Sequence, residues 1–322
     1  MRLLGYKGEC FISRDDIDKG NMVFSIGMDL QNSYSSHLKL CELATFLENL
    51  DAELVTIDFS NVKFIASNLF AVLGCIFMEF VERKPGTNRL KITGLNYSIK
   101  NLIQKNGFSI HFSEFEKQPD KFNTVIAYKQ FGRDNIKEYE MYLTYSIFSR
   151  KDLPEMSKEV SDDIRDSLLE LFKNVSDHTR SKHIYTCGQF FPKSKMLFFT
   201  IVDAGETIYK NVLEFHRRHK LNQPQYCLEW AIEEGNTTLD TTSPRGIGLS
   251  LMKDFVKHNK GSIYIISGIE TYEMVYSKER YRIFEKYSFP GTIVSIGFNL
   301  KDKTSYKVSV DVFVRVIKSP IS

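Results

Sequence analysis

Apolar and polar residues follow one another along the first third of the chain in short segments that predict alternating strands and helices. In residues 38–50 the apolar positions recur at helical spacing, whereas residues 54–59 (LVTIDF) form the short apolar run typical of a strand buried on both faces. Turn-forming residues separate the segments, and Gly107 ends the last of them. The predicted elements are strands at 22–28, 54–59 and 90–93, and helices at 38–50, 67–81 and 98–106.

A polar stretch at 114–122, which contains one proline, separates this part from the rest of the chain. Beyond it, apolar residues at helical spacing run from 153 to 175, and two apolar runs then flank a PKSK turn, which predicts a β-hairpin. The predicted elements are strands at 124–128, 184–191, 196–202, 262–267 and 292–298, helices at 153–175, 207–219, 225–234 and from 248, and a flexible loop at 235–245. We therefore expect an α/β protein with two domains, residues 1–118 and 119–322.

The composition narrows the class of protein. Of 322 residues, 42% are hydrophobic and 26% are charged, which is typical of a folded globular chain. The net charge of +3 is too small to favour nucleic acid or an anionic membrane as a partner. The most apolar window, 64–78, is shorter than a membrane span, and the first residues lack a signal-peptide pattern. We expect a cytoplasmic protein without a membrane segment.

The cysteines support the same expectation. They are odd in number, they lie far apart, and none forms a CxxC pair, so reduced thiols in the core are favoured over disulfides or a zinc site. They are Cys10, Cys41, Cys75, Cys187 and Cys227.

Three polar residues on the long predicted helix are the first candidates for chemistry. Glu170, Asn174 and Asp177 form a stripe beside the apolar face, at an edge where a cleft can form. The amide oxygen of Asn174 suits Mg²⁺, and the carboxylate of Glu170 can orient or deprotonate a nucleophile. Taken alone, this spacing more often belongs to a solvated helix face than to a ligand site. Three later segments favour the ligand site.

Each later segment is a turn beside a strand or helix. In IVDAGET (201–207) a strand ends at Asp203, whose carboxylate can accept a hydrogen bond from the exocyclic amine of adenine and would repel the carbonyl of guanine. In RGIGLSL (245–251) glycines precede an apolar helix, where phosphate oxygens can meet unpaired N–H groups. The third, FPGTIVSI (289–296), turns into a late strand. An Asx turn at Asp203 and an ordinary glycine-rich loop before the helix are the simpler interpretations.

The four segments, in this order and at these separations, resemble the N box and the three glycine boxes of the ATP-binding superfamily of gyrase, chaperone, histidine kinase and MutL proteins (GHKL). The resemblance covers about residues 135–300 and implies an α/β sandwich, in which helices cover one face of a mixed sheet. It also implies ATP and Mg²⁺ as ligands, Glu170 as the catalytic carboxylate, Asn174 as the Mg²⁺ ligand, and a lid over ATP at 209–245. The implied ATP-binding residues are Asn174, Asp177, Asp203, Gly205, Arg245, Gly246, Ile247, Gly248, Leu249, Ser250 and Thr292.

The sequence departs from the superfamily pattern in two boxes. Thr207 replaces the usual second glycine of the first glycine box, and Pro244 stands where histidine kinases have the first glycine of the second. ATP binding is therefore a firmer expectation than hydrolysis. Arg245 either reaches the γ-phosphate as a fixed cation or lies in solvent. A sensor histidine kinase is disfavoured, because no histidine lies between Phe112 and Asp177 to accept a phosphoryl group.

Residues 57–70 (IDFSNVKFIASNLF) resemble the central strand, loop and helix of STAS domains, the fold of anti-sigma-factor antagonists, and the resemblance covers about residues 20–115. In those antagonists a GHKL kinase phosphorylates a serine at the start of this helix. Ser67 aligns with that serine and is a candidate phosphoacceptor, although Ala66 replaces the acidic residue that precedes it there. The simpler interpretation is that Ser67 is the N-cap of the helix.

The two resemblances together predict a bacterial signalling protein that binds Mg-ATP and either hydrolyses it or phosphorylates a serine of a partner. Its STAS-like module would bind a STAS-like or regulatory protein or regulate the chain itself, and a homodimer is compatible with this function. The alternative is a non-catalytic module in which bound nucleotide controls protein interaction.

Overall fold

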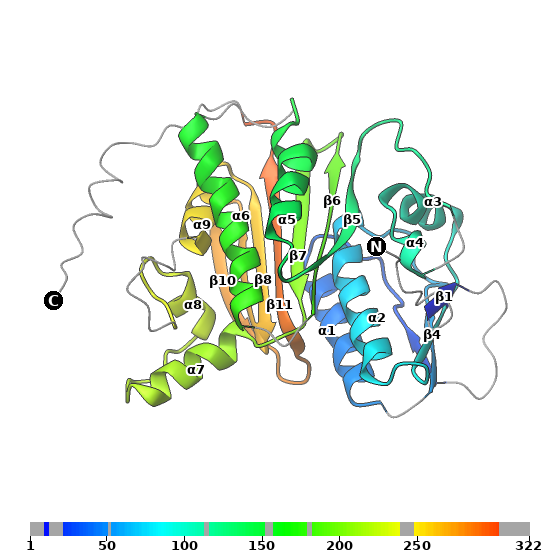
Figure 1. The fold of residues 1–322 in the computed structure, drawn as a ribbon, viewed down its shortest axis with the longest axis horizontal. Coiled ribbons are helices and arrows are strands. Elements are labelled where there is room, and N and C mark those ends of the chain that lie inside the picture. The colour runs from blue at the N-terminus through cyan, green and yellow to red at the C-terminus, as the bar shows by residue number, and fades with distance from the viewer. Residues whose placement is uncertain are drawn as a thin grey trace.

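The computed structural model describes residues 10–12, 22–50, 53–112, 116–151, 157–178, 182–238 and 248–302. Within these ranges the chain forms two sheets with helices between and around them, which confirms the expected α/β class (Figure 1). The strand orders are β1-β4-β3-β2 in the four-stranded sheet and β10-β9-β8-β11-β7-β6-β5 in the seven-stranded sheet.

The four-stranded sheet is parallel and is built from the first part of the chain. As predicted, β3 is buried along most of its length, and Gly107 ends α3 in the left-handed conformation with φ 83°. Ser33 caps α1 by accepting a hydrogen bond from the backbone N–H of Ser36. The elements are β1 (Cys10–Ile12), β2 (Met22–Ser25), α1 (Tyr34–Glu48), β3 (Leu54–Asp58), α2 (Phe70–Arg83), β4 (Arg89–Thr93), α3 (Tyr97–Asn106) and α4 (Ser109–Phe112).

The seven-stranded sheet differs from the expectation of a mixed sheet, because every pairing among its described strands is antiparallel. The predicted hairpin is confirmed as β6 and β7. The hairpin of β9 and β10 was not predicted, because β10 (KERYRI) is a half-exposed edge strand whose charged residues hide the strand pattern. The strands are β5 (Val125–Gly132), β6 (His183–Phe191), β7 (Met196–Asp203), β8 (Ser262–Gly268), β9 (Glu270–Val275), β10 (Lys278–Ile283) and β11 (Phe289–Asn299).

The helices of this second part include the long predicted helix, α6, and one helix that the sequence pattern did not indicate, α5. A π-helical turn at Thr144–Phe148 continues α5. Buried Glu270 caps α8, since its carboxylate oxygens accept hydrogen bonds from the backbone N–H groups of Cys227 and Leu228 at 3.0 and 2.8 Å. The helices are α5 (Ile136–Leu143), α6 (Lys158–His178), α7 (Ile208–Arg218), α8 (Cys227–Ile232) and α9 (Gly248–His258).

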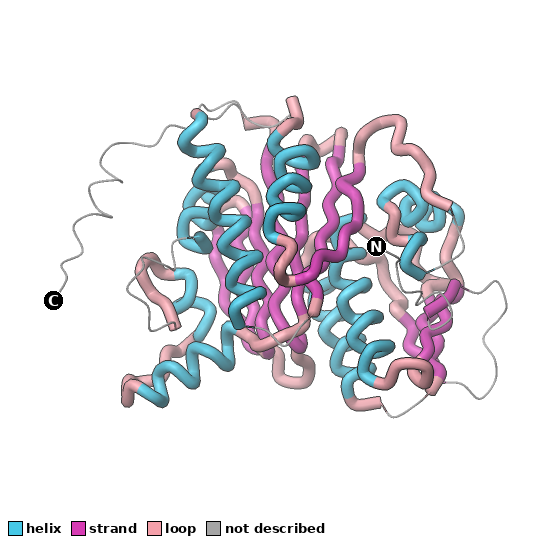
Figure 2. The backbone as a smooth tube through the Cα atoms, in the orientation of Figure 1, coloured by secondary structure: helices cyan, strands magenta, loops and turns pink. Residues whose placement is uncertain are grey.

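Helices cover both faces of the seven-stranded sheet. On one face, α5, α6, α8 and α9 share a hydrophobic core with the sheet. On the other face, α1 and α2 lie between the two sheets, as Figures 1 and 2 show. The sheets divide near the predicted boundary, since the four-stranded sheet ends at Thr93 and the seven-stranded sheet begins at Val125. The two parts nevertheless share a continuous hydrophobic core, so we expect them to move as one body.

Two contacts show how closely the parts fit. Gly74 of α2 lies against the ring of Tyr128 in β5, and a Cβ at this position would collide with that ring. The hydroxyl of Thr45 in α1 donates to the carbonyl of Ser288 at 3.1 Å and accepts from its N–H at 2.9 Å.

The buried thiols agree with the prediction of reduced core cysteines. Cys41, Cys75, Cys187 and Cys227 are free and buried, and the side chain of Cys10 lies outside the described residues. Among the helices that the structure describes, none is both long and apolar enough to cross a membrane.

Candidate functional site

Asp203 lies at the last position of β7, on the face of the sheet that the helices α5, α6 and α9 cover. Side chains of a strand alternate between faces, and Leu197, Phe199 and Ile201 all belong to the core beneath those helices. Asp203 continues this row. Its side chain is 2% exposed, and its Oδ2 atom has no hydrogen-bond partner in the described part of the chain. A buried carboxyl oxygen without a partner is costly, so this position needs an explanation beyond folding.

The buried surroundings of Asp203 change its acidity. Burial raises the pKa of Asp203 to about 8, although hydrogen bonding to the Thr292 backbone opposes this, and the charge of Glu79 raises the pKa further. The carboxyl group is therefore largely protonated at neutral pH in the protein alone. A ligand that offers a hydrogen-bond donor to Oδ2 would satisfy it and favour the ionised form.

Two hydroxyl groups extend the polar row from Asp203 across adjacent strands. Thr292 of β11 is paired with Asp203 on one side and with Ser267 of β8 on the other. The hydroxyl oxygens of Thr292 and Ser267 are 2.8 Å apart, and the Ser267 hydroxyl also accepts the backbone N–H of Ile208 at 2.8 Å. Asp203, Thr292 and Ser267 thus form one polar edge. Ser267 could not be predicted from the sequence, because only the strand order brings β8 beside β11.

Gly291 has a clear role in this edge. A Cβ at Gly291 would collide with the backbone carbonyl oxygen of Asp203, so only glycine lets β11 approach β7 this closely. The glycine of the FPGT segment is thus required by the contact with Asp203 itself.

The turn after β7 shows why residue 207 does not have to be a glycine. Thr207 is the N-cap of α7, and its hydroxyl accepts the backbone N–H of Lys210 at 3.0 Å. Its φ of −82° does not require glycine. Gly205 lies in the same turn and lines a pocket of about 230 Å³ together with Glu206, Thr207, Lys210 and their neighbours Ala204 and Pro290.

The helix α6 carries the predicted catalytic and metal-binding residues. Its predicted packing face is confirmed for Ile164, Leu168, Leu171 and Phe172, which are all buried. Glu170 is half-buried beside that face and has an interaction partner. Asn174 and Asp177 lie in the last turns of the helix, and their side chains are outside the described residues. The amide of Asn174 therefore stays a predicted Mg²⁺ ligand. Among the described residues, no group of three or more histidine, cysteine or acidic side chains is arranged to hold a metal ion.

The segment RGIGLSL (245–251) is described only from its second glycine, Gly248, onward. Arg245, Gly246 and Ile247 lie outside the described residues, and Gly248 begins α9. Leu249 packs against the core shared with α6, and Ser250 is half-buried with an interaction partner. The start of α9 and the helix α6 therefore lie on the same face of the sheet as Asp203.

Ser67, the candidate phosphoacceptor, is completely buried where the two parts of the chain meet. Its backbone N–H donates to Oε1 of Gln189 at 2.6 Å, and its hydroxyl accepts from the amide of Asn106 at 3.0 Å. The N-cap interpretation is wrong: Ser67 is the first residue of a 3₁₀ turn (Ser67–Leu69), the cap position is Ala66, and no side-chain cap bond is present there. A kinase could reach this hydroxyl only if the two parts separated.

No protein-family model matches the chain, and no curated protein matches it. The functional assignment therefore depends on the chemistry of the site. The structure brings Asp203 and Thr292 together, adds Ser267 to them, and covers the same face with α6 and α9.

Proposed function

We propose that the chain binds a purine nucleotide, ATP, on the face of the seven-stranded sheet that α5, α6, α8 and α9 cover. The observation that carries this proposal is the buried, unpartnered Oδ2 of Asp203 next to Thr292. The exocyclic amine of adenine is a hydrogen-bond donor that suits such a carboxylate. A base with a carbonyl in that position would leave the ionised carboxylate unsatisfied.

The helices of the same face supply groups for the rest of the ligand. The N–H groups at the start of α9, at Gly248, are suited to phosphate oxygens. Glu170 of α6 would act as the general base, and the amide of Asn174 would hold Mg²⁺ against the phosphates. Mg²⁺ would supply charge neutralisation on the phosphoryl group, and the acceptor would be water or the serine of a partner protein.

The base-recognition step can be tested by comparing ATP with inosine triphosphate, which carries a carbonyl in place of the amine. We expect the wild-type protein to bind ATP at least about tenfold more tightly than inosine triphosphate, because only ATP donates to Asp203. Asp203→Ala should remove this preference and weaken ATP binding, whereas Asp134→Asn, at an exposed carboxylate, is the matched control. Equal affinities of the wild-type protein for both nucleotides would refute the proposed contact.

A second measurement separates an enzyme from a non-catalytic nucleotide-binding module. The protein is incubated with γ-labelled ATP and Mg²⁺, and the label is followed to free phosphate or to protein. In an enzyme, Glu170→Gln should abolish transfer and retain ATP binding. If the wild-type protein binds ATP and transfers no label, the nucleotide is a regulatory ligand, and it should still protect the chain against thermal unfolding.

A further inference from the structure

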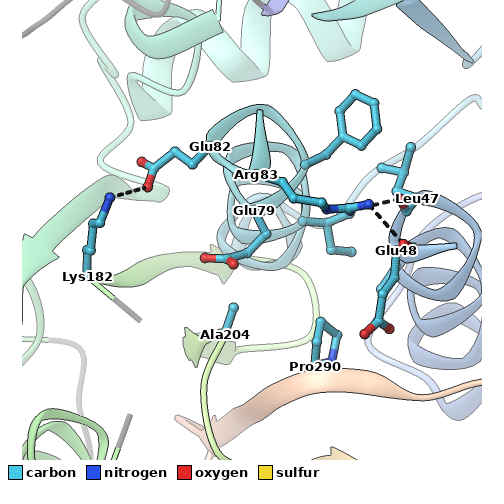
Figure 3. Close-up of a pocket in the computed structure, with 11 residues that line it drawn as sticks. Leu47, Glu48, Glu79, Glu82, Arg83, Lys182, Ala204 and Pro290 are labelled. Atoms are coloured by element: carbon cyan, nitrogen blue, oxygen red, sulfur yellow. Dashed lines mark hydrogen bonds and ion pairs between the residues drawn. The ribbon is translucent and has the colours of Figure 1, made fainter. Parts of the chain in front are cut away.

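A cleft lies where the two parts of the chain meet, on the face of the seven-stranded sheet opposite the proposed nucleotide site. Helices α1 and α2 form one wall, and Lys182, Ala204 and Pro290 belong to the other. Its volume is about 330 Å³, which is enough for a small organic molecule. Figure 3 shows the residues that line the cleft.

The walls of the cleft are mainly apolar, with charged groups among them. Apolar surface comes from Ala44, Leu47, Ile76, Phe80, Ala204 and Pro290. Three carboxylates, those of Glu48, Glu79 and Glu82, accompany two cations, Arg83 and Lys182. The balance of charge in the cleft is therefore negative, which favours a cationic ligand over an anionic one.

Both cations are already engaged. Arg83 donates to the backbone carbonyls of Leu47 and Glu48 at 2.8 and 2.9 Å, so it holds the end of α1. Nζ of Lys182 lies 3.7 Å from Oε2 of Glu82. Neither cation forms an ion pair with Glu79, although the charges of both lower its pKa. Glu48, the third acid, is exposed to solvent.

Glu79 is the half-buried acid of this cleft that has no protein partner among the described residues. Its side chain is half-buried and points from α2 into the space beside Ala204 (Figure 3). Its carboxylate has no hydrogen bond or ion pair with any residue in the described part of the chain. Burial raises the pKa of Glu79 to about 7, the charge of Glu82 adds to this effect, and Arg83 and Lys182 oppose it. A donor that carries positive charge would remove this penalty.

We propose that this cleft binds a compact organic cation, whose single ammonium or amidinium group pairs with Glu79 and whose apolar body packs against Leu47, Ile76 and Phe80. The pairing does not depend on the proposed nucleotide site. The two sites would nevertheless communicate, because Ala204 follows Asp203 directly and Pro290 lies two residues before Thr292. This coupling, unlike the binding itself, rests on the proposed function.

Benzamidine and its neutral analogue benzamide are suitable probes, because they share size and shape and differ in charge. With the full-length chain, titration calorimetry should show one benzamidine bound per chain. We expect benzamide to bind at least about tenfold more weakly, since the charged hydrogen bond is lost. Glu79→Gln, which keeps the shape of the side chain, should weaken benzamidine binding by a similar factor. Glu140→Gln, at an exposed position of α5, should bind it as the wild-type protein does.

A second variant tests the cleft independently of charge. Ala44→Leu places bulk in the cleft and should prevent benzamidine binding while the protein still unfolds in one cooperative transition. Asp203→Ala should still bind benzamidine, so that failure of the nucleotide proposal leaves this result intact. The proposal is overturned if the wild-type protein shows no saturable benzamidine binding, or if Glu79→Gln binds it as tightly as wild type.

Discussion

Ser67 and Asp203 are both buried polar residues on the seven-stranded sheet or directly against it, but the fold treats them differently. Ser67 is fully buried and has partners for its N–H and its hydroxyl, Gln189 and Asn106. Asp203 is almost as buried, and one of its carboxyl oxygens has no partner within the described residues. Packing of the two parts of the chain accounts for the burial of Ser67. The burial of Asp203 costs stability, and a bound ligand accounts for it better.

The surroundings of the two residues extend this contrast to the two faces of the sheet. Beside Ser67, the amide of Asn68 donates to the hydroxyl of Thr200 at 2.9 Å, and that hydroxyl lies 2.6 Å from the hydroxyl of Ser295. This polar network crosses the junction between the two parts and fixes their relative position. The opposite face is mainly apolar, and the hydroxyl of its buried Thr186 donates to the backbone carbonyl of Thr200 at 2.9 Å, whereas Asp203 and Thr292 lie at its edge. We infer that the first face holds the two parts of the chain together, whereas the second carries the proposed nucleotide site at its edge.

The largest expected effect is that of a negative charge at Ser67, which tests whether the junction opens. Ser67→Asp should lower the free energy of unfolding by about 3–5 kcal/mol, because it buries a carboxylate with no cationic partner. Urea unfolding, followed by circular dichroism, measures this change. Ser98→Asp, at an exposed position in the first turn of α3, is the matched control and should be close to neutral. Wild-type stability in Ser67→Asp would mean that the junction opens readily, and would revive the phosphoacceptor hypothesis.

Asp203→Asn should raise the free energy of unfolding, whereas Ser67→Asp lowers it, and the size of this gain should depend on pH. The folded pKa of Asp203, about 8, is above the ordinary value of about 3.9, so the folded protein holds this proton more tightly than the unfolded chain. The stability of the wild-type protein should therefore fall as pH rises from about 4 to about 8. The asparagine variant lacks this loss, so it should be more stable by about 2–4 kcal/mol at pH 8 and gain little near pH 4.

Thermal and urea unfolding at pH 5, 6, 7 and 8 would measure this difference between the two proteins. Asp134→Asn, in an exposed turn, should differ from wild type by the same small amount at every pH. A stability difference for Asp203→Asn that does not change with pH would contradict the raised pKa and would weaken the argument that the carboxyl awaits a ligand.

Part of the surroundings of Asp203 could be predicted from the sequence. The apolar runs of β6 and β7 predict a hairpin that ends at Asp203, and the helical spacing in α6 predicts its buried face, because these patterns depend on neighbours along the chain. The glycine of FPGT was identified as a turn, but its contact with the Asp203 carbonyl appears only when β11 lies beside β7. Ser267 joins the same edge through strand order, which no local pattern contains.

Other features could not be predicted because they depend on distant parts of the chain. Ser67 looked like a helix cap, since a serine before an apolar helix usually is one. Its partners Asn106 and Gln189 lie 39 and 122 residues away in the sequence, so the sequence could not indicate them. The antiparallel arrangement of the seven-stranded sheet was likewise not predicted, since the mixed sheet was implied by the resemblance and strand direction depends on pairings between distant segments.

The smallest of the three effects concerns the fit of α2 against the sheet, and it tests whether the junction is rigid. Gly74→Ala would normally favour a helix by up to about 1 kcal/mol. At this position the new Cβ would lie 2.8 Å from ring carbons of Tyr128, so we expect the variant to be less stable than wild type by about 1–3 kcal/mol. Tyr128→Leu removes the ring and should make the Gly74→Ala change neutral or favourable, which a double-mutant cycle of urea unfolding would detect. If Gly74→Ala stabilises the protein in the presence of Tyr128, then α2 can move away from β5, and Ser67 at the start of that segment is less firmly enclosed than its hydrogen bonds indicate.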